Sequence, residues 1–297
     1  MERFTWTAKD GKKISVVEWA AEQPVGVVQI SHGMAEHILR YEKLATYLNG
    51  LGFTVFGDDH RCFGQTDVEQ NGYTEGDNWE GTLSDLGELT EYYKEKYALP
   101  VLLFGHSYGS FLAQAYLQRY SDQIIGAILC GSDKLPVAST TFGFVLSSVI
   151  GAFKGDKAKA HFVANMTFGA YEKKLGGSMI SSIEAENERY RQDSLCGEVC
   201  SYGFYRHFFN GARKLYGKKG LRSVRKDLPV LLIAGENDPV GRFGKGMTQL
   251  YGMYHDLGLD VELILYEGAR HEILNDVCEE QVKQDISDFV KKVFAEV

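Results

Sequence analysis

The stretch Pro100-Val-Leu-Leu-Phe-Gly-His-Ser-Tyr-Gly-Ser110 decides the fold of this chain. Residues 100–104 form an apolar run with the length and composition of a strand buried on both faces of a parallel sheet. Residues 105–109 match the pattern G-x-S-x-G, and a helical pattern follows over 108–120. The pattern is weak by itself, but here it lies at a strand-to-helix turn, where glycines let the backbone crowd around an exposed serine. The stretch therefore predicts a nucleophilic serine, Ser107.

Strand and helix patterns alternate on both sides of this stretch. A hairpin is expected over residues 4–19. Strand patterns follow at 26–31, 53–56, 124–130, 229–234 and 261–266, and helical patterns lie at 41–51, 82–97, 245–257 and 279–295. Strands that alternate with helices predict an α/β fold with a mostly parallel, doubly wound sheet and helices on both faces.

The alternation stops between two of the strands. From residue 133 to residue 227 the pattern is helical and irregular, with glycines as punctuation. We expect residues 1–132 and 228–297 to form one core and residues 133–227 to form a helical lid or cap inserted between two strands. The apolar run 135–153 has the length of a short membrane span, but Pro136 and its Gly, Ser and Thr residues favour a buried or interfacial helix.

The composition of the chain excludes several classes of protein. The 297 residues are 44% hydrophobic and 24% charged, which excludes a disordered chain, collagen and a coiled coil. The formal net charge of −8 makes the chain a poor candidate for nucleic-acid binding, because phosphate contacts need clustered positive charge. We therefore expect no nucleic-acid partner.

The cysteines and the first ten residues indicate the cellular compartment of the protein. Five scattered cysteines with no CxxC pair indicate neither a disulfide framework nor a zinc site. The first ten residues are polar and lack the apolar core of a signal peptide. These features predict a cytoplasmic protein.

Candidate partners for the serine follow two other strands. Ligands of an open parallel sheet bind beyond the carboxyl ends of the strands, so residues just after each strand matter most. His271 follows the strand 261–266 and is the candidate base, while Asp238 follows the strand 229–234 and is the candidate acid. Asp133 is a rival acid, and Glu236 is a weaker one. The order Ser, Asp, His along the chain is the order of the α/β-hydrolases.

An acyl-transfer site also needs two backbone N–H groups for the developing oxyanion. One is expected from Tyr108, the residue after the nucleophile. The other is expected from the loop after the strand 26–31, which makes Met34 the candidate. We interpret His32, in the same loop, as a structural brace.

Taken together, these residues resemble one family, the α/β-hydrolases of the monoacylglycerol lipase and lysophospholipase group, which includes serine aminopeptidases. The matching stretches are HGMAEH at 32–37, RYEKLATYL at 40–48, GFTVFGDDHRCFG at 52–64, FGHSYGS at 104–110, PVLLIAGENDPVG at 229–241 and LYEGARHEILND at 265–276. The resemblance implies the α/β-hydrolase fold, with Ser107 as nucleophile, Asp238 as acid and His271 as base. It also implies Met34 and Tyr108 as oxyanion donors.

The chain departs from the family pattern at two positions. Cys62 stands where the family has a glycine in the loop after the strand 53–56, and this change is expected to alter the loop. Tyr108 stands where a Met or Leu is common, so its ring is expected to narrow the acyl pocket. Neither change touches the expected triad.

The expected reaction is hydrolysis of a carboxylic ester through an acyl-serine, with no metal or organic cofactor. A small, lipid-like monoacyl ester is favoured because the insertion is rich in apolar residues, and the residues expected to line its binding site are Phe142, Val145, Phe204 and Phe208. Two alternatives use the same triad, namely an aminopeptidase and an aryl or short-chain esterase. A more remote alternative is a binding protein without catalysis.

The charge is unevenly distributed along the chain. Residues 133–227 contain 16 Lys and Arg against 9 Asp and Glu, a net charge of +7, and seven of the basic residues lie between 213 and 226. One interpretation is a solvated helix face. The other is peripheral contact between a basic lid and an anionic membrane surface or substrate.

Overall fold

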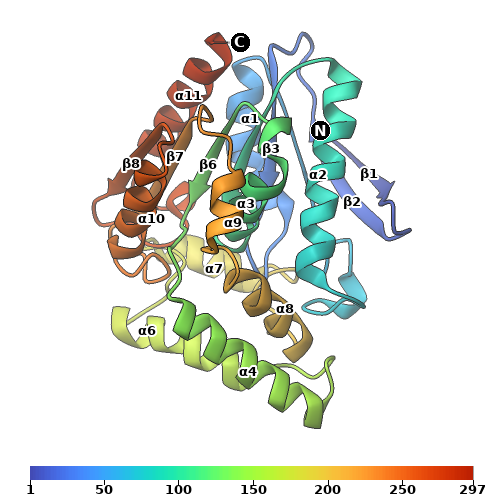
Figure 1. Cartoon of the computed structure of the whole chain (residues 1–297), viewed down its shortest axis with the longest axis vertical. Coiled ribbons are helices and arrows are strands. Elements are labelled where there is room, and N and C mark those ends of the chain that lie inside the picture. Colours follow the sequence, from blue (N-terminus) through green and yellow to red (C-terminus); the bar gives the residue numbers. More distant parts are fainter. Residues whose placement is uncertain (297) are drawn as a thin grey trace.

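The computed structural model describes residues 1–296, and its centre is a single eight-stranded sheet (Figure 1). The strand order is β1-β2-β4-β3-β5-β6-β7-β8. The bounds of the strands are β1 Glu2–Thr7, β2 Lys13–Trp19, β3 Gly26–Ser31, β4 Phe53–Asp58, β5 Val101–His106, β6 Gly126–Cys130, β7 Val230–Gly235 and β8 Val261–Tyr266. Strand β2 runs antiparallel to both of its neighbours, β1 and β4, and strands β3 to β8 run parallel to one another, which confirms the predicted mostly parallel sheet.

Helices cover both faces of the sheet. Helices α1 (Glu42–Gly50) and α11 (Glu279–Ala295) pack on one face, and α2 (Asn78–Tyr97), α3 (Tyr108–Tyr120) and α10 (Lys245–Asp256) pack on the other. Helix α2 begins four residues before the predicted start, because the Asp77 side chain accepts hydrogen bonds from the N–H groups of Trp79 and Glu80.

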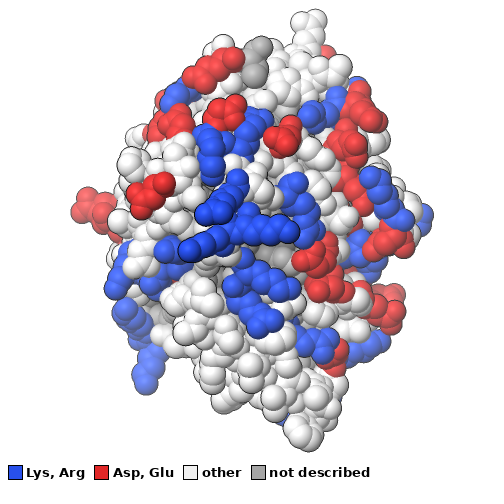
Figure 2. Space-filling model, in the orientation of Figure 1, with Lys and Arg blue, Asp and Glu red and all other residues white. Residues whose placement is uncertain are grey.

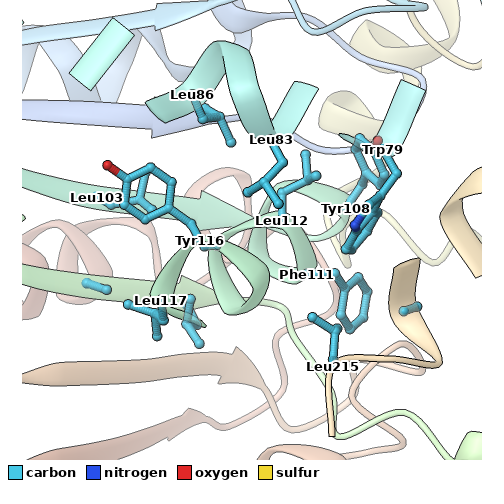
Figure 3. Packing of buried hydrophobic residues seen from close by; sticks show 14 of the residues in the cluster. Trp79, Leu83, Leu86, Leu103, Tyr108, Phe111, Leu112, Tyr116, Leu117 and Leu215 are labelled. Carbon is cyan, nitrogen blue, oxygen red and sulfur yellow. The ribbon is translucent and has the colours of Figure 1, made fainter. Parts of the chain in front are cut away.

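The central strands are buried and largely apolar because each one serves two cores. In β5, Val101 and Leu103 face the α2 and α3 side, whereas Leu102 and Phe104 face the α1 and α11 side. Figure 3 shows the first of these cores, in which Leu83 of α2 lies beside Leu112 of α3, and Leu103 of β5 lies beside Tyr116 of α3. Since both faces are closed, only the ends of the strands are left to carry polar chemistry.

Six helices lie in the chain between β6 and β7. They are α4 Val137–Lys154, α5 His161–Ala164, α6 Ala170–Leu175, α7 Glu184–Gln192, α8 Tyr202–Ala212 and α9 Lys218–Ser223. We call residues 133–227 the cap. Most of the cap lies beyond the carboxyl ends of the strands, with α4 farthest from the sheet (Figure 1). Helix α8 joins it to the core, because Gly211 packs so closely on the Trp79 ring that a Cβ there would lie 2.2 Å from it.

The basic part of the cap lies beside the core. Helix α9 packs against α3, and the Ser223 hydroxyl donates a 2.6 Å hydrogen bond to the backbone oxygen of Gln118. Figure 2 shows Lys and Arg gathered across the middle of this face, around α9, while the end of the molecule formed by α4 is mostly white. Positive charge and apolar surface therefore occupy different parts of the cap.

Helix α4 buries small side chains on the side that faces the rest of the protein. Its buried residues are Thr140, Gly143, Ser147 and Gly151, which are all small. Several of its large apolar residues are at least half exposed, and Phe153 is 88% exposed. Within residues 1–296 it is also the one helix long and apolar enough to span a membrane by length and composition, with a mean hydropathy of 1.4. Its packing against α8 accounts for its small buried side.

Candidate active site

Ser107 lies at the junction between β5 and α3, as predicted. Its backbone has φ 52° and ψ −120°, a left-handed conformation that a side chain rarely adopts. The Ser107 N–H donates a 3.0 Å hydrogen bond to the backbone oxygen of Cys130, at the end of the neighbouring strand. The strained turn is thus held from the side by β6, and it lifts the hydroxyl above the end of the sheet.

The glycines on both sides of the serine are required by close packing. A Cβ on Gly109 would lie 2.0 Å from the backbone oxygen of Ser31, and a Cβ on Gly105 would lie 2.6 Å from the backbone oxygen of Gly109. No side chain fits in either place without a backbone shift. The G-x-S-x-G pattern is therefore explained by contact between the first turn of α3 and the end of β3.

His271 and Asp238 complete a hydrogen-bonded relay with the serine. His271 Nε2 lies 2.8 Å from Ser107 Oγ, and His271 Nδ1 lies 3.0 Å from Asp238 Oδ2. Asp238 is fully buried, and its other oxygen accepts a 2.8 Å hydrogen bond from the N–H of Val240. The three side chains come from the ends of β5, β7 and β8, where the sequence placed them.

The two rival acids are not part of the relay. Asp133 is held by the Arg242 guanidinium, with 2.8 Å between Oδ1 and the nearest nitrogen. Burial raises the pKa of Asp133, although this guanidinium opposes the shift. Glu236 is exposed to solvent. The structure therefore brings only Asp238 to the His271 ring.

Met34 and Tyr108 lie next to the serine and line the same cavity. Within residues 1–296 neither of their N–H groups donates a hydrogen bond to another protein group, so both remain available to a ligand. A Cβ added to Gly33 would lie 3.2 Å from the Ser107 Cβ, which shows how closely the Met34 loop approaches the nucleophile. Unpaired N–H groups beside a nucleophile are one requirement for a pair of oxyanion donors.

A buried carboxylate, Glu36, holds this loop, and sequence reasoning did not single it out. Glu36 Oε1 accepts hydrogen bonds from the Gly33 N–H and, at 2.7 Å, from the Tyr41 hydroxyl. The Tyr41 oxygen lies 2.8 Å from Nδ1 of His106, the residue before the nucleophile. Burial alone would raise the pKa of Glu36, but His106 and the Arg40 guanidinium hold it well below its ordinary value. The loop is thus tied to the serine turn through an ionised side chain.

The cap contributes backbone contacts to the histidine loop. The N–H groups of His271 and Glu272 donate hydrogen bonds of 3.2 and 2.8 Å to the backbone oxygens of Met179 and Ile180. No local sequence signal marks residues 179 and 180, because a backbone carbonyl has the same chemistry in every residue. The cap therefore helps to position the candidate base as well as to cover the site.

A cavity of about 980 Å³ opens above Ser107, between the core and the cap. This volume is at the upper end of the roughly 300–1,000 Å³ of small-molecule pockets. Its walls are largely apolar and include Phe111, Leu135, Leu146, Tyr205 and Phe209.

Of the four residues predicted to line this site, the structure brings two to the cavity. Phe142 and Phe208 line it. Val145 and Phe204 are not among its lining residues within the described chain. Val145 points outward from α4 and is 50% exposed, and Phe204 is buried against Phe63 and the Tyr108 ring. The structure therefore does not bring these two residues to the cavity.

The loop with Cys62 keeps the backbone that a glycine would favour. Cys62 has φ 81°, in the left-handed region, and its side chain is fully buried. The Cys62 N–H donates a 2.9 Å hydrogen bond to the Asp67 carboxylate. The expected change of the loop is therefore limited to local backbone strain, which its hydrogen bonds and burial offset.

This fold and this site define a class of enzyme, the serine hydrolases with an α/β-hydrolase fold. The chain belongs to the family described as "Serine aminopeptidase, S33", whose model matches residues 22–277.

Relatives in this family are named as lipases. The chain is 26% identical to the monoglyceride lipase of Mus musculus over 275 residues, covering 91% of this chain and 83% of the relative. It is 24% identical to the monoacylglycerol lipase of Mycolicibacterium smegmatis over 294 residues, covering 94% and 93%. A thermostable carboxyl esterase from Bacillus coagulans, solved in complex with glycerol, superposes with a TM-score of 0.89 at 26% identity and covers 98% of that chain and 99% of this one. The protein is a carboxylic ester hydrolase.

His32 is a neutral, fully buried imidazole, and this makes stability depend on pH. Its Nδ1 lies 2.7 Å from the Gly33 backbone oxygen, and its Nε2 accepts a 2.8 Å hydrogen bond from the His60 N–H. Burial, followed by the nearby His60, lowers the pKa of His32 from 6.5 to about 4. Protonation would abolish the acceptor at Nε2.

Because the folded pKa of His32 is below the unfolded value, the unfolded chain binds more protons between pH 6.5 and 4, and stability falls as the pH falls. We expect this group to cost about 2 kcal/mol of unfolding free energy between pH 6.5 and 5, at roughly 1.4 kcal/mol per pH unit. Urea unfolding at pH 7 and pH 5 measures the loss. This loss of unfolding free energy should shrink in His32→Gln and persist in the control His255→Gln, because His255 is exposed. Equal losses in all three proteins would contradict the assignment.

Proposed function

We propose that this protein hydrolyses monoacylglycerol-like esters by a Ser-His-Asp mechanism with an acyl-serine intermediate. The observation that carries the proposal is the relay of 2.8 and 3.0 Å from Ser107 through His271 to Asp238, opening onto a large apolar cavity. The relatives named monoglyceride lipase support the same chemistry.

In the proposed first step, His271 Nε2 takes the proton of Ser107 as the oxygen attacks the ester carbonyl. Asp238, hydrogen-bonded to Nδ1–H, keeps the imidazole in the tautomer that leaves Nε2 free to accept, and it stabilises the imidazolium that forms. The N–H groups of Met34 and Tyr108 bind the oxyanion. Imidazolium then protonates the leaving alcohol, and water attacks the acyl-serine by the reverse proton path.

We expect Ser107→Ala to lower kcat by about 10⁶-fold, because no other side chain takes the acyl group. Asp238→Asn is expected to lower kcat by about 10⁴-fold, because the amide favours the wrong tautomer of His271. Asp133→Asn is the matched control and should change kcat by less than about tenfold, since Asp133 lies outside the relay. The assays are hydrolysis of p-nitrophenyl butyrate and labelling of Ser107 by a fluorophosphonate. Equal losses of kcat in Asp238→Asn and Asp133→Asn would contradict the assignment of Asp238 as the acid.

The apolar cavity supports a long acyl chain in preference to a short one. Transfer of each methylene into an apolar site contributes about 0.8 kcal/mol, so kcat/KM should rise along a series of monoacylglycerols until the cavity is filled. The two alternatives on the same triad differ in this respect. An aryl or short-chain esterase would show no such rise, and an aminopeptidase would prefer aminoacyl amides to acyl esters.

Gly143 offers a sharper test of the acyl site. It lines the cavity on α4, and a Cβ there would lie 2.7 Å from the Phe209 ring. We expect Gly143→Leu to lower kcat/KM at least about tenfold for a long-chain monoacylglycerol, with little change for p-nitrophenyl acetate. Val145→Leu, on the outward face of α4, is the matched control and should change neither value. A uniform loss on both substrates in Gly143→Leu would argue against an acyl site beside α4.

We further infer that the cap, residues 133–227, acts as a lid that contacts membranes peripherally, in a protein located in the cytoplasm. Its support is the outward apolar side of α4, where Phe142, Val149 and Phe153 are 57%, 52% and 88% exposed. Exposed apolar side chains of this density are typical of interaction sites. The basic residues of α9 would add attraction to anionic lipid, at about 1 kcal/mol for each one near the surface.

Sedimentation with vesicles tests this contact. We expect the wild type to bind vesicles of anionic phospholipid, and Val149→Ser combined with Phe153→Ser to weaken binding by about tenfold or more. Val277→Ser, an exposed valine outside the cap, is the control. Replacing Lys218, Lys219 and Arg222 by Ala should remove the salt-sensitive part of binding. A wild type that does not sediment with these vesicles would rule out the membrane contact.

A further inference from the structure

A cluster of three possible metal ligands lies beside the oxyanion loop, outside the catalytic relay. It consists of His37, from the core, and Asp193 and Cys196, from the loop after α7. One ligand atom of each residue lies within 4.8 Å of the others, and His37 Nε2 is 2.8 Å from Asp193 Oδ2. The cluster joins segments that are more than 150 residues apart, so it depends on how the cap docks on the core.

The His37 ring has unused hydrogen-bonding capacity. Its side chain is 7% exposed, and Nδ1 has no hydrogen-bond partner among the described residues. One nitrogen of the ring is therefore left without a competing protein contact among these residues. Asp193 and Cys196 are only partly buried, so an ion from solvent can reach the cluster.

The donor set selects the kind of ion. Imidazole nitrogen, thiolate sulfur and carboxylate oxygen together suit Zn²⁺, whereas Mg²⁺ and Ca²⁺ prefer oxygen alone. Atoms bound to one zinc at about 2.0–2.3 Å lie roughly 3–4 Å from one another, so modest side-chain rotations are enough to close the site. Three protein ligands leave a fourth position for water.

The charges around the cluster allow a divalent cation to bind. Arg40 is the nearest basic group that acts on Cys196, but its guanidinium is neutralised by two carboxylates, being paired with Glu272 and lying 3.3 Å from Glu36. Burial raises the pKa of the Cys196 thiol, so the free protein carries it protonated. A zinc ion bound by one carboxylate and one thiolate would leave the site itself neutral.

We propose that His37, Asp193 and Cys196 form a zinc-binding site that fastens the cap to the oxyanion loop. Zinc forms bonds to one nitrogen of the neutral His37 ring, one Asp193 oxygen and the Cys196 sulfur. The thiol proton is released to solvent, and the imidazole keeps its one proton on the nitrogen that does not bind. No change of oxidation state occurs.

The position of the site predicts what the metal would hold. Ala35, two residues before His37, has φ 55°, and its carbonyl accepts 2.9 Å hydrogen bonds from the Tyr190 hydroxyl and the Gly197 N–H. Tyr190 and Gly197 flank the two cap ligands in the chain. Zinc would therefore lock the cap segment 190–197 onto the loop that carries Met34, and it would restrict opening of the cavity at this side.

The test is zinc titration of the untagged protein in competition with a chromophoric chelator. We expect one zinc per chain in the wild type. Cys196→Ser and Asp193→Asn should weaken binding by more than the roughly 10- to 100-fold that loss of an outer-shell partner causes. Cys278→Ser is the matched control, since Cys278 is also partly exposed but lies at the start of α11. Binding of Co²⁺ should produce a thiolate-to-metal absorption band in the wild type and in Cys278→Ser, and this band should be lost in Cys196→Ser.

Two results would overturn the proposal, and both are independent of esterase activity. One is a wild type that binds no zinc under these conditions. The other is zinc affinity that is unchanged in Cys196→Ser and Asp193→Asn while circular dichroism shows both variants folded. Hydrogen exchange gives a further measure: zinc should slow exchange at residues 190–197 in the wild type and leave it unchanged in Asp193→Asn.

Discussion

The contact between the first turn of α3 and the end of β3 is the constraint on which the site depends. The Gly109 backbone lies directly against the backbone oxygen of Ser31, where no side chain fits. This contact fixes the strained turn at Ser107 and the start of the loop that carries Met34 at the same time. The nucleophile and the oxyanion loop are therefore held by backbone packing, and the buried Glu36 carboxylate ties the two segments together a second time.

The parts of the site that the sequence predicted are those with local signals. Ser107, Asp238 and His271 each follow a strongly apolar strand, and the sheet brings strand ends together, so order and spacing were enough to select them. Glu36 and the carbonyls of Met179 and Ile180 had no such signal. A carboxylate in a polar loop is ordinarily solvated, and only the tertiary structure shows that Glu36 is 3% exposed and bonded on several sides. Their contributions arise from docking of distant segments, which spacing does not encode.

Val145 and Phe204 do not reach the cavity because of the way α4 and α8 pack. Apolar residues of a helix normally face the interior, and this rule placed Val145 in the cavity. In α4 the small residues Gly143 and Gly151 face inward, because the helix packs closely on Phe209 and Tyr202 of α8. Val145, Val149 and Phe153 are left at least half exposed. Phe204 misses the cavity for the opposite reason: on α8 its ring turns toward Phe63 and the Tyr108 ring in the core, while Phe208, one turn later, reaches the cavity.

The packing of α4 and α9 also accounts for the separation of charge and apolar surface in the cap. Helix α4 packs on α8 through small residues, and α8 is itself held on the core by Gly211 against Trp79. Helix α9 instead packs against α3, where the chain returns to the core, and its basic residues Lys218, Lys219 and Arg222 are exposed. The excess of positive charge between residues 133 and 227 thus belongs largely to the segment 213–226, which includes α9 beside the sheet, while the part of the cap farthest from the sheet is mostly free of charge. Contact with a bilayer through α4 would accordingly be governed first by burial of side chains and only second by charge.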